Sequence, residues 1–562
     1  MYQKFILLIL LSFILLPTYG QNIHLQVIGQ TDTETKTISE AEYKSTHLNY
    51  QSVLSELDSL SSRLQKQGYI NHSTTTISRI NDSTINASIY LNQKFETIKI
   101  YYNPESISKN IIKQITEESY NDYFILSFPL IEEKLNRLNL ILSQSGQPFT
   151  KTKLSELQIE DHFLKCNLIV YQNDTPRQID KIIIKGYPKF PEKFLKYQAK
   201  IKTGSTLNIT EITQKSKNLN ELSFVNQIRA PELLFTKDST ILYIYVEKQK
   251  NNTFDGYLGF TTNENTNKLE FSGYLNLGLQ NNLNFGESLR LKYRSDENSQ
   301  RNFNLKLDIP YIFKSPIGTQ LELNIFKKDT TFTTVDQTLK FYYQFNTKHR
   351  LYLGLNKSSS NNLLETSTSQ IEDFNKTRFT SQYIYQKNSN SEQRLIPIKT
   401  YLDFEFGTGK RSISNTSENQ HIIQGTAYNS FYLNPKNSIF TQVSGAALIS
   451  DNYFENELFR FGGINSIRGI EENSLSATLF SVLNLEYRLK LKNDLILHSI
   501  TDFAYLENKI YSQKEKIFSF GVGFMILTKA GLLKFDYANS KPENTPFNIS
   551  NSKIHLSLTN YF

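Results

Sequence analysis

The chain contains very little cysteine, no tryptophan and, beyond its first twenty residues, no long apolar run. Its single cysteine, Cys166, excludes a disulfide framework, a cysteine-based zinc site and an iron–sulfur cluster. Eight histidines are scattered so that no pair has the spacing of metal ligands. A membrane-spanning helix needs about 20 consecutive apolar residues. The lack of such a run, with a mean hydropathy of −0.43, excludes a bundle of membrane helices.

Aromatic residues, by contrast, are abundant. The 33 Tyr and 38 Phe residues make up 13 % of an otherwise rather polar chain, which favours β-structure over disorder. A net charge of +8 on 562 residues is mild, so the sequence predicts no nucleic-acid partner. The length indicates either several domains or one large barrel with smaller attachments.

Residues 1–20 have the pattern of a secretory signal peptide. Lys4 supplies the positive start, Phe5 to Leu16 form the apolar core, and small residues stand at −3 and −1 of a cut before Gln21. The alternative is a membrane anchor, but this short core ends at Pro17 and cannot easily span a bilayer. No cysteine follows the core, which excludes lipoprotein modification. We therefore expect an exported protein, and a single cysteine agrees with that.

Residues 21–250 repeat one pattern about every 75–80 residues. Each unit opens with a short alternating strand, continues with two helical segments and closes with two strands. We therefore predict three small α+β units, at 21–94, 95–175 and 176–250.

The third unit shows the pattern most clearly. Thr210 is its candidate helix N-cap. The strands predicted in this unit are 182–186, 224–230 and 239–247, and the helices are 194–200 and 210–222. In the second unit we expect a strand at 95–100, a helix at 130–146 and a closing strand at 162–171. In the first unit we expect a strand at 23–29, a helix at 53–67, and strands at 69–80 and 84–92.

The β-α-α-β-β order of these units resembles the POTRA domain, a polypeptide-transport-associated module of the periplasm. The resemblance implies that an exposed sheet edge, with the groove beside it, takes up extended client segments by strand addition. The alternative is that the units are generic α/β spacers.

Residues 251–562 lose helical periodicity and alternate with period two. The longest example is Leu483–Leu491, in which Leu and Tyr alternate with Asn, Glu, Arg and Lys. Charged residues at every other position are typical of strands that line a water-filled lumen, and the apolar residues between them are typical of a lipid-facing outer surface. The pattern continues for about 310 residues, which is too long for one sandwich, and in lipid only a closed barrel pairs every backbone group. At about 19 residues per strand and connection, we predict about 16 antiparallel strands.

The last strand carries a further signal. Residues 554–562 alternate and end in an aromatic residue, with Leu558 and Phe562 as the candidate signal positions. Bacterial outer-membrane barrels commonly end in this way, and the machinery that folds them reads the signal.

The segment Phe459–Ile470 contains a motif that indicates a protein family. Its residues of interest are Phe461, Gly462, Gly463, Ile467, Arg468, Gly469 and Ile470. The segment resembles the large-loop signature of the BamA/TamA/two-partner-secretion superfamily, whose core is Val/Ile-Arg-Gly-Phe/Tyr. Ile470 departs from the usual aromatic residue, and the downstream segment around Asp502 lacks the family's glycine. With the POTRA-like units, the resemblance covers nearly all of the chain after residue 20.

In that family the loop folds back into the lumen and its arginine contacts an acidic residue of the inner wall. The resemblance implies Asp502 as the partner of Arg468, with Glu486 as second choice, because a planar guanidinium can hold a carboxylate with two hydrogen bonds. The glycines at 462, 463 and 469 would permit a tight backbone. The alternative for Arg468 is a solvated loop residue.

The sequence contains no catalytic motif, so we predict that the chain is not an enzyme. Gly-x-Ser-x-Gly and His-Glu-x-x-His are both absent. A Ser/His pair formed in space through His498 or His421 is the alternative. Gly521 and Gly523 lie in a strand pattern with no helix after them, which excludes a nucleotide loop.

The leading interpretation is an assembly or insertion factor of the bacterial outer membrane, with its N-terminal units in the periplasm. The units would gather unfolded outer-membrane or secreted proteins. The first barrel strand, near 254–262, and the last, near 553–562, would form a weak seam where a client strand pairs. Accessory periplasmic or lipoprotein subunits and the lipid bilayer are the other expected partners, and neither cofactor nor metal is implied. The alternatives are a dedicated two-partner-type secretion transporter and a passive pore or receptor.

Overall fold

The structure is a computed structural model. The residues that it describes are 22–160, 163–172, 175–262, 269–295, 300–364, 370–389, 395–414, 416–543, 545–546 and 548–562. The signal peptide predicted at 1–20 lies outside them. The chain divides into two compact units, which are described separately here. One runs to Ile179 and includes Gly204–Glu211, and the other comprises Asp180–Thr203 and Ile212–Phe562.

The first domain of the first unit is a four-stranded sheet with two helices, in the sheet order β2-β1-β4-β3. Strands β1 and β4 are parallel, and β3 is an edge strand whose nine residues are all exposed. One face of α3 is buried because apolar residues recur at helical spacing at Val53, Leu57, Leu60 and Leu64. The elements are β1 Ile23–Ile28, α2 Asp32–Glu40, β2 Thr46–His47, α3 Tyr50–Lys66, β3 Ser73–Asn81 and β4 Thr84–Tyr90.

The second domain repeats this architecture in the order β6-β5-β8-β7. Leu138 and Leu142 of α5 and Cys166 of β8 lie in its core. The period-two pattern did not predict β6, a short apolar run, or β7, whose register shifts between Ser155 and Gln158. The elements are β5 Thr97–Tyr101, α4 Lys109–Ile112, β6 Tyr123–Ser127, η1 Phe128–Leu130, α5 Ile131–Gln144, β7 Lys151–Glu160 and β8 Phe163–Tyr171.

The third domain has a three-stranded sheet in the order β10-β11-β9. The prediction of Thr210 as N-cap is wrong: α7 begins one residue earlier, and Asn208 Oδ1 accepts the Glu211 N–H at 3.0 Å. Asn208, which directly precedes the helix, thus takes the capping role. The elements are β9 Lys181–Lys185, α6 Lys193–Tyr197, α7 Ile209–Ser216, η2 Lys217–Glu221, β10 Val225–Phe235 and β11 Thr240–Lys248. Within the part of the chain that the structure describes, no helix combines the length and apolarity needed to cross a membrane.

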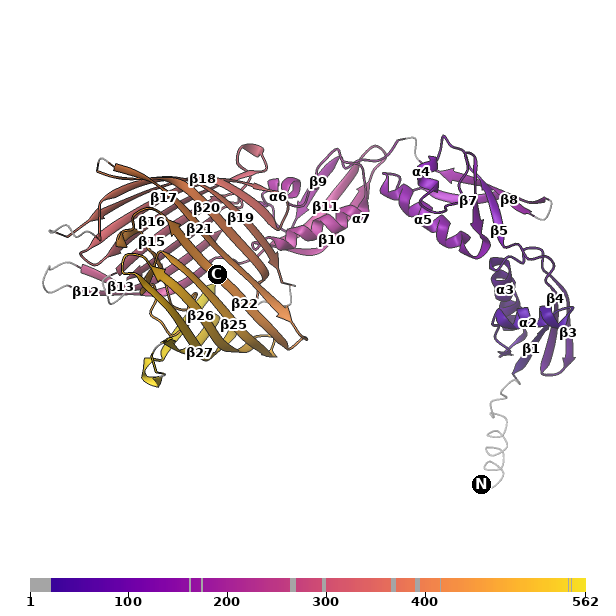
Figure 1. The fold of residues 1–562 in the computed structure, drawn as a ribbon. Coiled ribbons are helices and arrows are strands. Elements are labelled where there is room, and N and C mark those ends of the chain that lie inside the picture. The colour runs from indigo at the N-terminus through magenta and orange to yellow at the C-terminus, as the bar shows by residue number, and fades with distance from the viewer. Residues whose placement is uncertain are drawn as a thin grey trace, which may run out of the picture. The chain divides into compact units, whose positions relative to one another are not determined.

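The rest of the chain forms a closed antiparallel barrel of 16 strands, drawn from pink through orange to yellow in Figure 1. Each strand pairs with its neighbours in chain order, apart from β22, which pairs with β25. The strands are β12 Thr253–Thr262, β13 Leu269–Gln280, β14 Ser288–Ser295, β15 Gln300–Ile309, β16 Ile317–Lys328, β17 Phe332–Gln344, β18 His349–Asn362, β19 Phe374–Asn388, β20 Ile398–Ile413, β21 Thr416–Tyr432, β22 Asn437–Ile449, β25 Leu479–Lys492, β26 Leu495–Asn508, β27 Gln513–Thr528, β28 Gly531–Pro542 and β29 Lys553–Tyr561.

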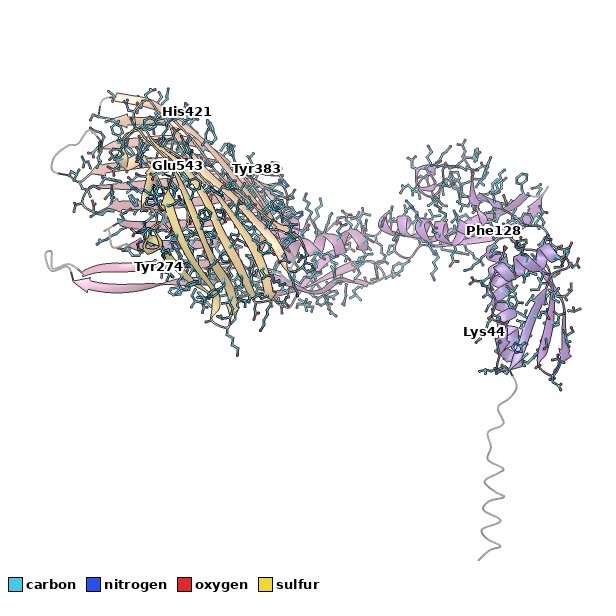
Figure 2. All side chains as sticks on the ribbon, turned by 60° about the horizontal axis from the view of Figure 1, so that its bottom comes forward. Lys44, Phe128, Tyr274, Tyr383, His421 and Glu543 are labelled. Carbon is cyan, nitrogen blue, oxygen red and sulfur yellow. The ribbon has the colours of Figure 1, made fainter. Side chains whose placement is uncertain are left out.

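Side chains project from both faces of the barrel wall (Figure 2). Alternate residues of each strand therefore point to the lumen and to the outside. In β25, Glu486 and Arg488 are buried toward the lumen, whereas Tyr487 between them is 49 % exposed on the outside. The same parity holds in β29, where Ile554 and Leu556 are exposed. Apolar residues therefore cover the outer face, as a lipid-facing barrel requires.

The ring closes through a short contact between its first and last strands. Strands β12 and β29 pair only at Thr253↔Tyr561 and Phe254↔Asn560, whereas β12 forms ten pairs with β13 and β29 forms seven with β28. Eight of the ten residues of β12 therefore form no backbone pair with β29, although the Ser557 hydroxyl of β29 donates to Asp255 of β12 at 3.2 Å. We call this contact the seam.

Candidate functional site

The long connection between β22 and β25 lies inside the barrel, and we call residues 450–478 the luminal loop. It contains η4 (Glu455–Glu457) and a small hairpin of β23 (Phe459–Phe461) and β24 (Leu475–Ala477). The family-like motif lies between the two hairpin strands.

Arg468 lies at the centre of a buried ion cluster. Its Nη2 and Nε donate to Oδ1 and Oδ2 of Asp502 at 2.6 and 2.9 Å, and its backbone N–H donates to Oδ2 at 3.0 Å. Its Nη1 donates to Glu486. Arg468 is 2 % exposed and Asp502 is fully buried. A planar fork on a carboxylate with both side chains out of water fixes the loop backbone against β25 and β26.

The cluster is electrically balanced. Besides Asp502 and Glu486 it contains Asp536, 3.8 Å from Arg468 Nη1. Arg488 Nε donates to Glu486 at 2.7 Å, and Lys534 Nζ lies 3.1 Å from Asp536. Three carboxylates thus face two guanidiniums and one ammonium. A buried charge is tolerated only when it is paired and hydrogen-bonded in this way.

The glycines of the motif adopt conformations that other residues rarely take. The φ angles are +116° at Gly462, +96° at Gly463 and +81° at Gly469. A Cβ atom at Gly469 would lie 2.8 Å from the backbone nitrogen of Ser540 in β28. The Gly469 carbonyl oxygen accepts the Ser540 hydroxyl at 2.8 Å. Only glycine lets the loop backbone approach the wall this closely.

Apolar residues of the motif hold the loop from its other side. Phe461 stacks on Phe480 with ring centroids 4.3 Å apart, and Ile467 is fully buried. Ile470, at the position where the family has an aromatic residue, is partly buried against the same cluster.

The root of the loop has a second anchor, which the sequence did not predict. Glu457 accepts from Lys376 Nζ at 3.0 Å, from Gln420 Nε2 at 3.0 Å and from Arg411. The side chains of Glu457 and Arg411 are fully buried. The acidic stretch at 455–457 was the available signal, but its basic partners lie on β19 and β20, far away in sequence. The loop is therefore fixed at two places on the barrel wall.

The loop also contacts the last strand. The Gly469 N–H donates to His555 Nε2 at 3.2 Å, and Lys553 Nζ donates to Glu471 at 2.9 Å. Of the two candidate signal positions, Leu558 lies further along β29 and is 43 % exposed, and Phe562 directly follows β29 and is 48 % exposed. The Phe562 N–H donates to the carbonyl of Asn252 at 3.0 Å, at the seam.

The two histidines considered for a Ser/His pair have other contacts. His498 Nε2 lies 2.8 Å from Asp536 Oδ1 within the ion cluster. His421 packs parallel to Phe406, with ring centroids 6.3 Å apart. Gly523 lies in β27, and a Cβ atom there would be 2.5 Å from His498 Nε2, so glycine leaves room for that histidine. No group of three or more potential metal ligands occurs among the described residues.

A family model described as the Omp85 superfamily domain matches residues 201–562, which is more than half of the chain. The chain belongs to the Omp85 superfamily. This confirms the predicted resemblance to the BamA/TamA group. An Omp85 barrel implies an outer-membrane location.

Solved Omp85-like structures share the fold. The structure of BamA from Haemophilus ducreyi lacking POTRA domains 1–3 matches with a TM-score of 0.51 and 14 % identity, covering 83 % of this chain and 100 % of that chain. CdiB from Acinetobacter baumannii matches with a TM-score of 0.52 and 14 % identity, covering 90 % and 97 %. CdiB from Escherichia coli matches with a TM-score of 0.52 and 11 % identity, covering 90 % and 98 %. No curated protein matches the sequence.

The predicted architecture is therefore confirmed: POTRA-like α/β domains precede a closed antiparallel barrel of 16 strands. At these identities the structural matches establish the fold and do not distinguish between roles within the superfamily.

Proposed function

We propose that this Omp85 protein is an outer-membrane assembly and insertion factor. Its N-terminal domains, placed in the periplasm, capture unfolded outer-membrane proteins, and the seam inserts them into the bilayer. The observation that carries the proposal is the contact of only two residue pairs between β12 and β29.

The physical argument concerns backbone groups in lipid. Each backbone N–H or C=O left unpaired in hydrocarbon costs several kcal/mol, so a barrel edge without a partner strand is unfavourable. A client strand that pairs with the free part of β12 or β29 satisfies those groups. The free energy of client folding drives the reaction, and no nucleotide or cofactor is required.

Strand edges also support the capture step. Strand β3 ends the first sheet with nine exposed residues, and β7 ends the second sheet with exposed Leu157 and Ile159. Long exposed edges carry unpaired backbone groups that an extended segment can bind by strand addition. The chemistry that recognises a client is thus its extended backbone, with apolar side chains on one face.

The luminal loop favours this role over a passive pore. Two buried ion clusters, at Arg468 and at Glu457, hold the loop inside the bore. An open pore would be obstructed by them. A client that enters at the seam leaves them in place.

Depletion of the protein, followed by quantitative proteomics of the outer membrane, tests the proposal. An assembly factor predicts the loss of many barrel proteins. The loss of one secreted protein with intact barrels would show dedicated export instead, and unchanged levels of both classes would contradict the proposal. A variant carrying Cys166→Ser serves as the complementing control, because this thiol is buried in the core of the second domain.

A further inference from the structure

An apolar patch lies on the inner wall of the barrel, where polar side chains prevail. It consists of Ile496 of β26, Met525 and Leu527 of β27, and Leu532 of β28. These residues lie at the end of the barrel where the chain enters at Thr253, which we call the inner mouth. Apolar side chains that face a hydrated bore are unfavourable unless something covers them.

The cover comes from a distant part of the barrel. Leu395 and Ile396, which Pro397 separates from β20, belong to the same cluster and are 6 % and 9 % exposed. Strands β27 and β28 are five and six positions away from β20 around the ring. A segment that starts at β20 and packs on those strands must cross the inner mouth, because following the wall would not bring it there.

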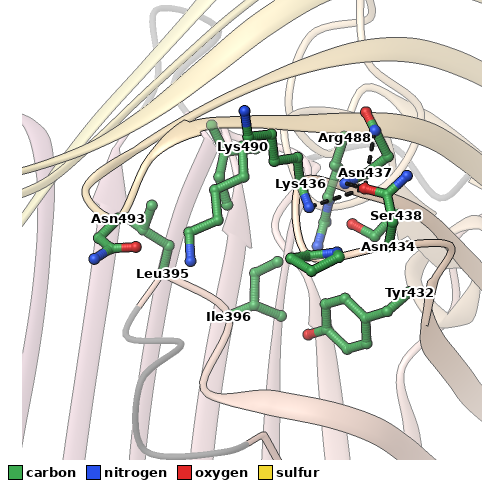
Figure 3. Close-up of a pocket in the computed structure, with 12 residues that line it drawn as sticks. Leu395, Ile396, Tyr432, Asn434, Lys436, Asn437, Ser438, Arg488, Lys490 and Asn493 are labelled. Carbon is green, nitrogen blue, oxygen red and sulfur yellow. Dashed lines mark hydrogen bonds between the residues drawn. The ribbon is translucent and has the colours of Figure 1, made fainter.

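The segment also borders a hollow (Figure 3). Leu395 and Ile396 line this pocket together with Ile496 of the patch, and its empty volume of about 400 Å³ includes open solvent. The cationic residues Lys436, Arg488 and Lys490 line the pocket as well. The segment is thus held by apolar contact with the patch and borders open space beside that contact.

Beyond the segment the bore is polar. A second cavity has an empty volume of about 660 Å³, which includes open solvent, and Gln382, Asp403 and Glu405 are among its lining residues. The luminal loop lines this chamber through Phe459 and Arg460.

We propose that residues 395–397 are a removable seal of the inner mouth, which docks on the apolar patch and closes that side of the bore to ions and solutes. The seal is connected to the third domain. The Ser389 N–H donates to the Pro397 carbonyl at 2.9 Å, and the neighbouring Asn388 donates to the Glu221 carbonyl of η2 at 3.4 Å. Movement of η2 therefore acts on the base of the seal.

Ion conductance of the full-length protein in planar bilayers tests the seal. A double substitution, Leu395→Asp with Ile396→Asp, places two charges on the apolar patch, and we expect open events to become about tenfold more frequent. Leu433→Asp is the matched control, because Leu433 lies in a turn at the same mouth but is 60 % exposed and outside the cluster. Equal conductance of the double variant, the control and the parent would overturn the proposal.

A milder variant covers the case in which the double variant does not fold. In a Cys166→Ser background, Ile396→Cys should react with a bulky maleimide at least about tenfold more slowly than Leu433→Cys, since the first thiol is exposed only when the seal opens. In a variant that carries both Ile396→Cys and Met525→Cys, a short bis-maleimide that joins the two thiols should suppress the residual conductance of that variant. Equal labelling rates at 396 and 433 would refute docking. Neither experiment depends on client assembly, so the seal can fail while the proposed function stands.

Discussion

Single side chains decide how the luminal loop is held. The Arg468 guanidinium donates two hydrogen bonds to Asp502 and a third to Glu486, with Asp536 close by. When one partner of a buried ion pair is removed, the other charge stays buried without compensation, and the cost is about 3–5 kcal/mol. Exposed pairs contribute far less, because water and salt screen them.

Arg468→Lys should therefore destabilise the barrel by about 3 kcal/mol, since an ammonium cannot reproduce the planar fork. The temperature at which the folded barrel loses its faster mobility in SDS gels measures this loss. Arg294→Lys is the control, because the Arg294 side chain is 47 % exposed and lies 3.6 Å from Glu472. An identical transition temperature for both variants would contradict a stabilising role for Arg468.

Charge reversal extends this test. With Arg468→Ala the cluster has an excess of carboxylates, and adding Asp502→Arg returns a cation next to Glu486 and Asp536. The double variant should recover part of the lost stability and activity. If Arg468→Ala alone behaved like the parent in both assays, the role of the cluster would be disproved.

The single cysteine reports on the second domain. Burial in that core raises the pKa of the Cys166 thiol to about 12, from an ordinary value of 9.0. The thiol should not react with iodoacetamide at pH 8 until the domain unfolds, because the thiolate is the reactive form. Labelling followed by mass spectrometry, with and without urea, measures this. Rapid labelling of the native protein would contradict the buried position of Cys166.

The same shift predicts a pH dependence with a definite sign. The native state binds the thiol proton more tightly than the unfolded state does. The contribution of the Cys166 thiol to the free energy of unfolding is therefore complete below pH 9.0 and is lost as the pH rises toward 12. Cys166→Ser should remove that part of the alkaline destabilisation.

At the scale of secondary-structure elements, local patterns predicted the strands better than their partners. Period-two alternation is a local property, so β25 could be found at 483–491 from the sequence. In β7 a bulge near Glu156, where φ is +55°, interrupts the alternation, and that strand was missed. The Glu457 anchor was missed for a different reason: its partners are set by the closure of the barrel, which a local pattern does not reveal.

This second anchor leads to a prediction for the loop as an element. Glu457→Gln leaves Lys376 buried without its counter-charge and leaves Arg411 with Glu418 as its remaining carboxylate, so the barrel should lose about 3 kcal/mol of stability. Glu471→Gln, on the same loop, is the matched control, because its pair with Lys553 is largely exposed and should change stability by less than about 1 kcal/mol. Denaturant titration followed by gel mobility compares them. Equal midpoints would show that the loop does not need its root anchor.

At the scale of the whole molecule, the ring is weakest where the two ends of the barrel sequence meet. The number of residue pairs between β12 and β29 depends on how the whole barrel closes. No pattern in the sequences of these two strands predicts that number. The luminal loop and the proposed seal obstruct the bore, whereas the seam has two pairs over ten residues. Under the proposed function, a client strand therefore enters laterally at the seam.

Covalent closure of the seam tests this account most directly. In a Cys166→Ser background, Phe254→Cys and Asn560→Cys place thiols on directly paired strand residues, whose spacing suits a disulfide. A matched pair, Leu339→Cys with Leu355→Cys, bridges β17 and β18 away from the seam. We predict that oxidation of the seam pair blocks outer-membrane protein assembly in proteoliposomes, that a reductant restores it, and that the control pair has no effect. Undiminished assembly by a fully oxidised seam would contradict the account.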